Sequence, residues 1–168
     1  MDETGVNTAM TRRYGRAPRG ERVHDSAPRN YGTHTSVISA LGLRGLVATL
    51  TVEGAVDTTC FDAYVERVLG PQLRRGDVVV LDNLGAHRAS RLEEVAASRG
   101  AQVLWLAPYS PDFNPIEQCW SKIKSYLRGV KARTGDALNK ALAQAITLVT
   151  KSDIRGWFKH CGYSLARK

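Results

Sequence analysis

The stretch PYSPDFNPIEQCWSKIK, residues 108–124, packs three prolines into its first eight residues and then continues with helical periodicity. Asn114 is a favourable N-cap residue, and Pro115 at the first helical position loses no hydrogen bond, because that N–H has no partner there. Glu117 follows three residues after Asn114, where a carboxylate can complete a capping box and meet the positive end of the helix dipole. Taken alone, the stretch explains Glu117 as a helix cap.

The helix predicted from Pro115 to about residue 128 has two different faces. Its apolar positions form a stripe that we expect to be buried, made of Ile116, Trp120, Ile123 and Leu127. The other face carries Glu117, Ser121, Lys124 and Arg128. A carboxylate at the tip with bases behind it suits DNA phosphates running along the helix. A solvated helix face is the alternative.

Outward from this helix, the chain predicts one α/β domain over residues 1–168. Residues 35–43 and 45–54 are predicted as the two strands of a hairpin joined around Gly42 to Gly45. Continuous apolar runs at residues 77–83 and 101–108 indicate strands buried on both faces of a sheet, and other segments have helical spacing. The predicted strands cover residues 35–43, 45–54, 77–83 and 101–108, and the predicted helices cover residues 57–73, 90–100, 115–128, 135–152 and 153–162. Strand–helix–strand units favour parallel pairing, with helices on the faces of a mixed sheet.

Composition narrows the class of protein. There is no apolar run of membrane-spanning length and no signal-peptide pattern at the first residues. The three cysteines are far apart and form no CxxC pair, which favours reduced thiols over a zinc site or disulfides.

Basic residues exceed acidic residues by 24 to 16, a formal charge of +8, and they are clustered. One cluster near the start of the chain comprises Arg12, Arg13, Arg16, Arg19, Arg22 and Arg29. A second surrounds the helix that carries Glu117 and comprises Lys122, Lys124, Arg128, Lys131 and Arg133. Two arginine-rich clusters favour a nucleic-acid partner, although a charge excess can also serve solubility alone.

Two further acids change the interpretation of Glu117. Asp82 ends the predicted strand VVVLD, and active sites in α/β sheets gather beyond the carboxyl ends of strands. Asp-Asn is also an ordinary turn former, so Asp82 has a structural alternative. Together with Asp2, these residues provide three carboxylates from separate segments. Carboxylates and substrate phosphates are what a two-magnesium phosphoryl-transfer site needs.

At this point the chain resembles a known family, the insertion-sequence DDE transposases of the mariner-like superfamily. The resemblance rests on DET at residues 2–4, VVVLDNLGAH at residues 78–87 and PYSPDFNPIEQCWSKIK at residues 108–124. Thirty-four residues separate Asp82 from Glu117, the D-D-34-E spacing of the bacterial branch. The resemblance implies an RNase H-like fold and cut-and-paste DNA transposition. It also implies two Mg²⁺ or Mn²⁺ ions, TA target sites, a dimer in the active complex and a place at the nucleoid in the cytoplasm.

The resemblance also assigns roles to residues. Asp2 matches the acid that bridges both metals, Asp82 the acid that binds one metal with it, and Glu117 the acid that binds the other. Neighbouring motif positions imply groups that support the ligands or contact DNA, namely Glu3, Asn83 and His87. The prolines before Glu117 would then restrict the chain so that its carboxylate is held precisely.

The chain departs from the family in two respects. Asp2 follows only Met1, so we expect the first central strand to be largely missing and Asp2 to be a frayed terminus. No helix-turn-helix segment is visible, so we expect a catalytic fragment, a split-frame product or an internal start. Two alternatives to a transposase domain remain open, a metal-dependent nuclease of the same fold and an inactive DNA-binding remnant.

Overall fold

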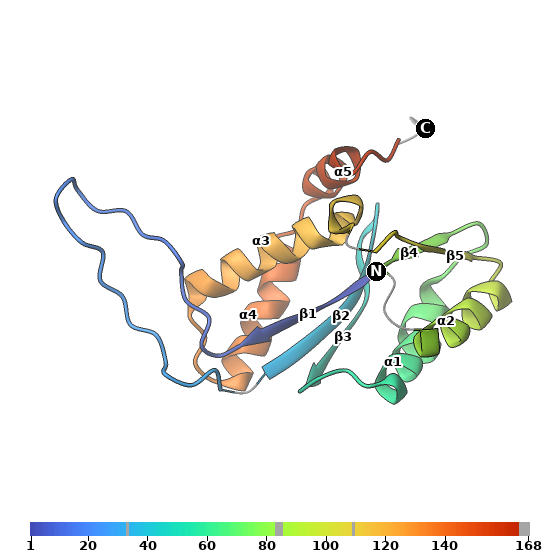
Figure 1. Ribbon diagram of the computed structural model, residues 1–168, viewed down its shortest axis with the longest axis horizontal. Helices are drawn as coiled ribbons and strands as arrows, with labels where there is room; N and C mark the ends of the chain where they lie inside the picture. Colours follow the sequence, from blue (N-terminus) through green and yellow to red (C-terminus); the bar gives the residue numbers. More distant parts are fainter. Residues whose placement is uncertain (33, 83–85, 109, 165–168) are drawn as a thin grey trace.

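The computed structural model describes residues 1–32, 34–82, 86–108 and 110–164, leaving aside the side chains of residues 86–89. Two small sheets lie side by side, with helices on both sides of them (Figure 1). In the described ranges, none of the helices has the length and apolar character to cross a membrane.

The first sheet is antiparallel, in the order β1-β2-β3. It comprises β1 (Asp2–Asn7), β2 (His34–Gly42) and β3 (Gly45–Glu53). The register pairs Asp2 with Ser39 and Asn7 with His34. Sheet and register therefore fix the position of Asp2.

The second sheet is parallel and has two strands, β4 (Val78–Leu81) and β5 (Gln102–Trp105). Helix α2 (Ala86–Ser98) connects them, as the strand–helix–strand pattern predicts. The Met1 ammonium group donates a hydrogen bond to the Val80 carbonyl and so links the two sheets.

Local capping explains where most of the helices begin. Asp57 caps α1 (Thr58–Tyr64), which runs on through a π-helical turn η1 (Val65–Leu69) and a 3-10 turn η2 (Gly70–Gln72). Another 3-10 turn, η3 (Pro111–Phe113), precedes α3 (Pro115–Val130). Thr134 caps α4 (Gly135–Thr147), and a capping box of Thr150 and Asp153 begins α5 (Lys151–His160).

Both faces of the first sheet are covered, because neighbouring residues of a strand point to opposite sides. Val37 of β2 packs in a cluster with α3 and α4, whereas Ile38 packs in a second cluster with α1, η1 and β4. The apolar stripe predicted on α3 is confirmed, since Ile116, Trp120, Ile123 and Leu127 are all at most 2% exposed. This packing holds the first turn of α3 against the start of β1.

Three expectations from the sequence need correction. The first strand is not largely missing, because Asp2–Asn7 form β1 and Asp2 is held in a ladder with β2. In the described residues, the strands form two sheets instead of the one mixed sheet that we expected. The Met1 nitrogen donates a hydrogen bond to Val80 of β4, but β1 and β4 do not pair as strands. The helix predicted over residues 135–152 ends at Thr147, because Thr150 starts α5 with its own cap.

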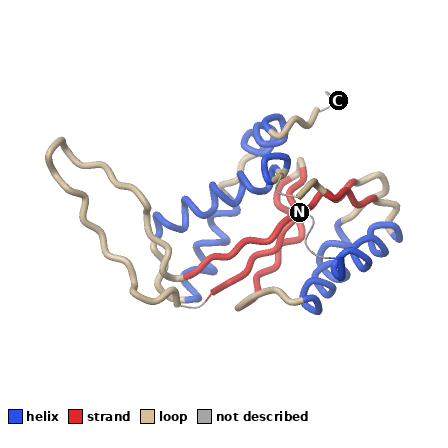
Figure 2. The backbone as a smooth tube through the Cα atoms, viewed as in Figure 1, coloured by secondary structure: helices blue, strands red, loops and turns tan. Residues whose placement is uncertain are grey.

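Residues 8–32 form a loop that is exposed from Arg12 onward and projects away from the sheets (Figures 1 and 2). Its base is tied to the end of α3. Arg133 donates to the carbonyls of Thr8 and Met10, at 2.8 and 3.1 Å, and Lys131 forms an ion pair with Asp25. The loop therefore presents Arg12 and Arg13 beside the basic face of α3.

Candidate active site

Two of the predicted acids line one hollow at the carboxyl ends of the parallel strands. Asp82 directly follows β4, and Glu117 lies in the first turn of α3; both are exposed. The hollow has a volume of about 440 Å³, and its other described walls are Leu106, Pro108, Ser110, Pro111 and Asn114. The loop after β5 thus brings Glu117 opposite Asp82, as the strand order predicts.

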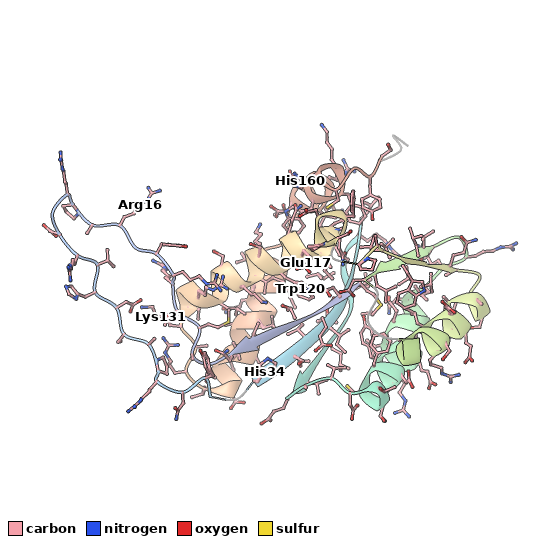
Figure 3. All side chains as sticks on the ribbon, in the orientation of Figure 1. Arg16, His34, Glu117, Trp120, Lys131 and His160 are labelled. Atoms are coloured by element: carbon pink, nitrogen blue, oxygen red, sulfur yellow. The ribbon has the colours of Figure 1, made fainter. Side chains whose placement is uncertain are left out.

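Asp2 approaches the same region from β1. It shares a smaller hollow with Asp82, lined also by Met1, Glu3 and Leu81 among others. Its carboxylate accepts a hydrogen bond of 3.0 Å from Nε1 of Trp120 on α3. Trp120, which is labelled in Figure 3, is only 2% exposed, so a buried indole holds the Asp2 side chain.

The charges of Glu117 and Asp82 act on the Asp2 carboxylate. Burial, together with the nearby charges of Glu117 and Asp82, raises the pKa of Asp2 to about 6. Within the described ranges, no three Asp, Glu, His or Cys side chains are grouped closely enough to hold a metal ion together. The acids therefore border one site without converging on a single point.

The start of α3 also bears on the capping explanation of Glu117. The side chain of Asn114 makes no capping hydrogen bond to α3; its Nδ2 instead donates to the Met1 carbonyl at 3.5 Å. Asn114 is 5% exposed and so connects the tip of α3 to the start of β1. The capping box predicted from Asn114 and Glu117 is therefore not what organises this helix end.

A basic groove runs along α3 from Gln118, the residue that follows Glu117. We use this name for a hollow of about 1170 Å³ between the projecting loop, α3 and α5, lined by Arg12, Arg13, Tyr14, Gln118, Ser121, Lys122, Ser125, Tyr126, Arg128, Gly129, Val130, Asp153 and Trp157. Partial burial and the charge of Arg128 lower the pKa of Lys124, while Glu117 and Asp2 oppose that shift. Burial and the charge of Arg13 lower the pKa of Arg128. Cations are thus crowded together directly behind the acids.

The remaining predicted residues divide into several groups. Glu3 points to the face of β1 opposite Trp120, beside Ile38 and Phe61 in the smaller hollow. Asn83 lies outside the described residues, as does the side chain of His87. Three arginines lie farther out on the projecting loop and line no part of the basic groove, namely Arg16, Arg19 and Arg22 (Arg16 is labelled in Figure 3).

Sequence reasoning missed the polar role of Trp120 and of Asn114. The sequence places Trp120 in the apolar stripe of α3, and its ring is indeed buried there. The sequence suggests only a capping role for Asn114, which its side chain does not fill. The hydrogen bonds of Trp120 with Asp2 and of Asn114 with Met1 each span more than 110 positions of the chain. The one available signal was that a buried indole N–H needs an acceptor.

Comparisons with known proteins place this geometry in a family. A family model described as "DDE superfamily endonuclease" matches residues 1–139. The Tcb2 transposase of Caenorhabditis briggsae is 28% identical over 85 residues, which is 48% of this chain and 31% of that protein.

Solved structures show the same fold. A pre-cleavage Mos1 transpososome matches with a TM-score of 0.71 and 13% identity, over 95% of this chain and 50% of that chain. A Mos1 mariner paired-end complex with Mn matches with a TM-score of 0.65 and 16% identity, over 96% and 52%. The Mos1 catalytic domain with Raltegravir and Mg matches with a TM-score of 0.58 and 16% identity, over 78% and 73%.

These matches confirm the predicted RNase H-like fold and the resemblance to mariner-like transposases. The chain spans about a third of the curated relative and about half of the first two of these structures. The family model covers most of the chain, and it includes all three predicted acids. The chain therefore belongs to the DDE superfamily endonuclease family.

Proposed function

We propose that this chain is the part of a transposase that cuts DNA and joins transposon ends to target DNA. The observation that carries the proposal is that Asp2 and Asp82 line one hollow and Asp82 and Glu117 line a second, while the charges of Glu117 and Asp82 act on the Asp2 carboxylate. A family of endonucleases with this fold acts on phosphodiester bonds, and the arrangement supplies an acidic centre with a cationic track leading to it.

The residues present suit divalent metal ions. Three carboxylates are the oxygen donors that Mg²⁺ and Mn²⁺ prefer, and the raised pKa of Asp2 reflects burial and repulsion that a bound cation would relieve. We propose that Asp2, Asp82 and Glu117 hold two such ions, which would activate the attacking oxygen and stabilise the leaving one. Trp120 would orient the Asp2 carboxylate, as hydrogen-bonded neighbours of metal ligands commonly do.

The chain's own cations give the DNA its path. Lys124 lies nearest the acids, and Arg128 and Arg13 follow along the basic groove. We propose that they neutralise successive phosphates, while Ser121 and Arg12 contribute further backbone contacts. The outer arginines of the projecting loop, Arg16, Arg19 and Arg22, would contact DNA beyond the groove. Glu3, Asn83 and His87 remain proposed as groups that support the ligands or contact DNA.

The proposed function also implies binding partners, namely DNA and a second copy of the protein. The similar solved structures include paired-end complexes of Mos1, which favours DNA and a second protein copy in the working assembly. Transposon ends, TA target sites and action at the nucleoid are the finer expectations.

A strand-transfer assay tests the proposal. A pre-cleaved, labelled transposon end is incubated with target DNA, the chain and Mn²⁺, and joined product is measured. Joined product that depends on Mn²⁺ supports a transposase domain. Cutting without joining would instead show a nuclease of the same fold. Neither cutting nor joining, together with metal-independent thermal stability, would show a DNA-binding remnant.

A further inference from the structure

Helix α5 has a basic side that the proposed DNA path along α3 does not use. Four of its residues recur at the spacing of one helix side, and all four are exposed; we call them the α5 face: Ser152, Arg155, Gly156 and Lys159. The acid of this helix, Asp153, lies on another side and pairs with Lys122 of α3. Among the described residues, no ion pair engages Arg155 or Lys159. Both charges are therefore available to a partner.

The α5 face borders a hollow of about 760 Å³. Its other described walls come from the turn after the helix, namely Gly162, Tyr163 and Ser164. The Tyr163 hydroxyl donates to the Phe113 carbonyl at 2.9 Å, so this turn is fastened to the segment that precedes α3. In the part of the chain that the structure describes, the lining has two cations and three hydroxyl groups and no carboxylate. Such a lining suits an anion.

Gly156 gives the α5 face its shape. It lies in the middle of α5, where glycine is less stable than alanine. A Cβ atom added there would meet no heavy atom within 4 Å, and the backbone is not left-handed, so nothing within the described chain requires a glycine. The missing side chain does leave the helix backbone open between Arg155 and Lys159. A phosphate group has room to approach closely at this point.

The hollow lies on a different side of α5 from the basic groove. Asp153 and Trp157 line the groove, whereas the α5 face lines the hollow. The end of α5 lies beside the first turns of α3 (Figure 1), because Gln118 donates to the Cys161 sulfur at 3.7 Å. The α5 face therefore offers a second basic path, separated from the first by the helix itself and starting near the same end of α3.

We infer that the α5 face binds the phosphate backbone of a second DNA segment, while the basic groove holds the first. One phosphate lies over Gly156 between the charges of Arg155 and Lys159, and the Ser152 hydroxyl donates to the same strand. The inference rests on the proposed function, because joining a transposon end to target DNA requires two DNA segments on the protein at once. The contacts are to phosphates, so they position this segment without reading its sequence.

The test measures DNA binding by the full chain in EDTA, so it is independent of metal and of catalysis. Analytical ultracentrifugation with a short labelled duplex counts the duplexes bound per chain, and fluorescence anisotropy gives their affinities. One variant combines Arg155→Ala with Lys159→Ala. The matched control combines Arg74→Ala with Arg99→Ala, which removes the same charge from two exposed arginines that line neither hollow. A third variant, Gly156→Gln, changes no charge and fills the space above the helix.

The parent chain and the arginine control should bind two duplexes per chain, and the variant without Arg155 and Lys159 should bind one. Gly156→Gln should weaken the second duplex by about tenfold or more, because the phosphate loses its charged hydrogen bonds. Its melting temperature should not fall, since glutamine forms helices better than glycine. A loss of DNA binding in Gly156→Gln therefore reports blocked access and not unfolding.

The failure of this inference is distinct from the failure of the proposed function. Lys124→Ala with Arg128→Ala tests the basic groove alone, and unchanged DNA binding there would count against the proposed DNA path and not against the α5 face. A parent chain that bound one duplex would overturn the inference. So would equal losses in the α5 variant and the arginine control, or a Gly156→Gln chain that bound the second duplex as the parent does.

Discussion

The hydrogen bond from Trp120 to Asp2 gives a sharp test of how the site is held. Trp120→Phe keeps most of the buried ring but removes the N–H that the Asp2 carboxylate accepts at 3.0 Å. Because Trp120 is 2% exposed, water cannot easily take its place. Hydrogen bonds to charged groups contribute about 1.5–3 kcal/mol, which corresponds to about a 10- to 150-fold change in affinity. Neighbours of metal ligands typically change metal affinity by about 10- to 100-fold, in the same range.

Isothermal titration with Mn²⁺ at pH 8 measures the effect. The matched control is Trp157→Phe, since Trp157 packs against the same core cluster and lines the basic groove instead of contacting Asp2. We expect Trp120→Phe to weaken Mn²⁺ binding by about tenfold or more, and Trp157→Phe to leave it near that of the parent chain. In an Asp2→Ala background, Trp120→Phe should have no further effect on Mn²⁺ binding. A Trp120→Phe chain with a lower melting temperature and unchanged Mn²⁺ affinity would refute the positioning role and leave Trp120 as a packing residue.

Three further predictions concern the acids, the bases and the last helix. Asp82→Ala and Glu117→Gln should each abolish metal-dependent cutting and joining while leaving DNA affinity largely intact; near-normal catalysis by Glu117→Gln would remove it from the ligand set. Lys124→Ala with Arg128→Ala should reduce the slope of log affinity against log salt by up to about two units, measured by fluorescence anisotropy on duplex DNA, and an unchanged slope would return both residues to a solvated face. Asp153→Ala should lower the free energy of unfolding by about 0.5–2 kcal/mol in urea titrations at pH 7, because it removes the α5 capping box and the ion pair with Lys122. Hydrogen bonds from Lys122 and Thr150 lower the pKa of Asp153 to about 2. The stability that Asp153 contributes is therefore fully present above its unfolded pKa near 4 and is lost as the pH falls toward 2. A stability difference between the parent and Asp153→Ala chains that grew in acid would contradict this assignment.

The sequence predicts the helices and strands β2 to β5 of this fold, but it predicts neither β1 nor the division into two sheets. The apolar stripe of α3 is visible because helical spacing of large side chains survives in any context. The end of α4 is harder, because apolar residues continue past Thr147 and only the Thr150–Asp153 pair marks the new start. Strand β1 gives almost no signal, since DETGVN is polar and contains a glycine; its pairing with β2 comes from tertiary contacts.

The candidate site also has parts that the sequence predicts and parts that it does not. The acids could be chosen from strand ends and from the family resemblance, and the structure brings Asp82 and Glu117 to one hollow. The bond from Trp120 to Asp2 could not be chosen, because it joins residues that only the fold brings together. The division of the basic residues between the groove and the outer loop also depends on the path of residues 8–32, which have no periodic pattern.

Anomalous scattering from Mn²⁺ in a crystal of this chain tests the central claim most directly, because it locates bound metal independently of activity. Our account predicts Mn²⁺ peaks coordinated by oxygens of Asp2, Asp82 and Glu117, and predicts that Glu117→Gln removes at least one of them. Mn²⁺ bound elsewhere, with no peak at these three carboxylates at saturating concentration, would contradict the account.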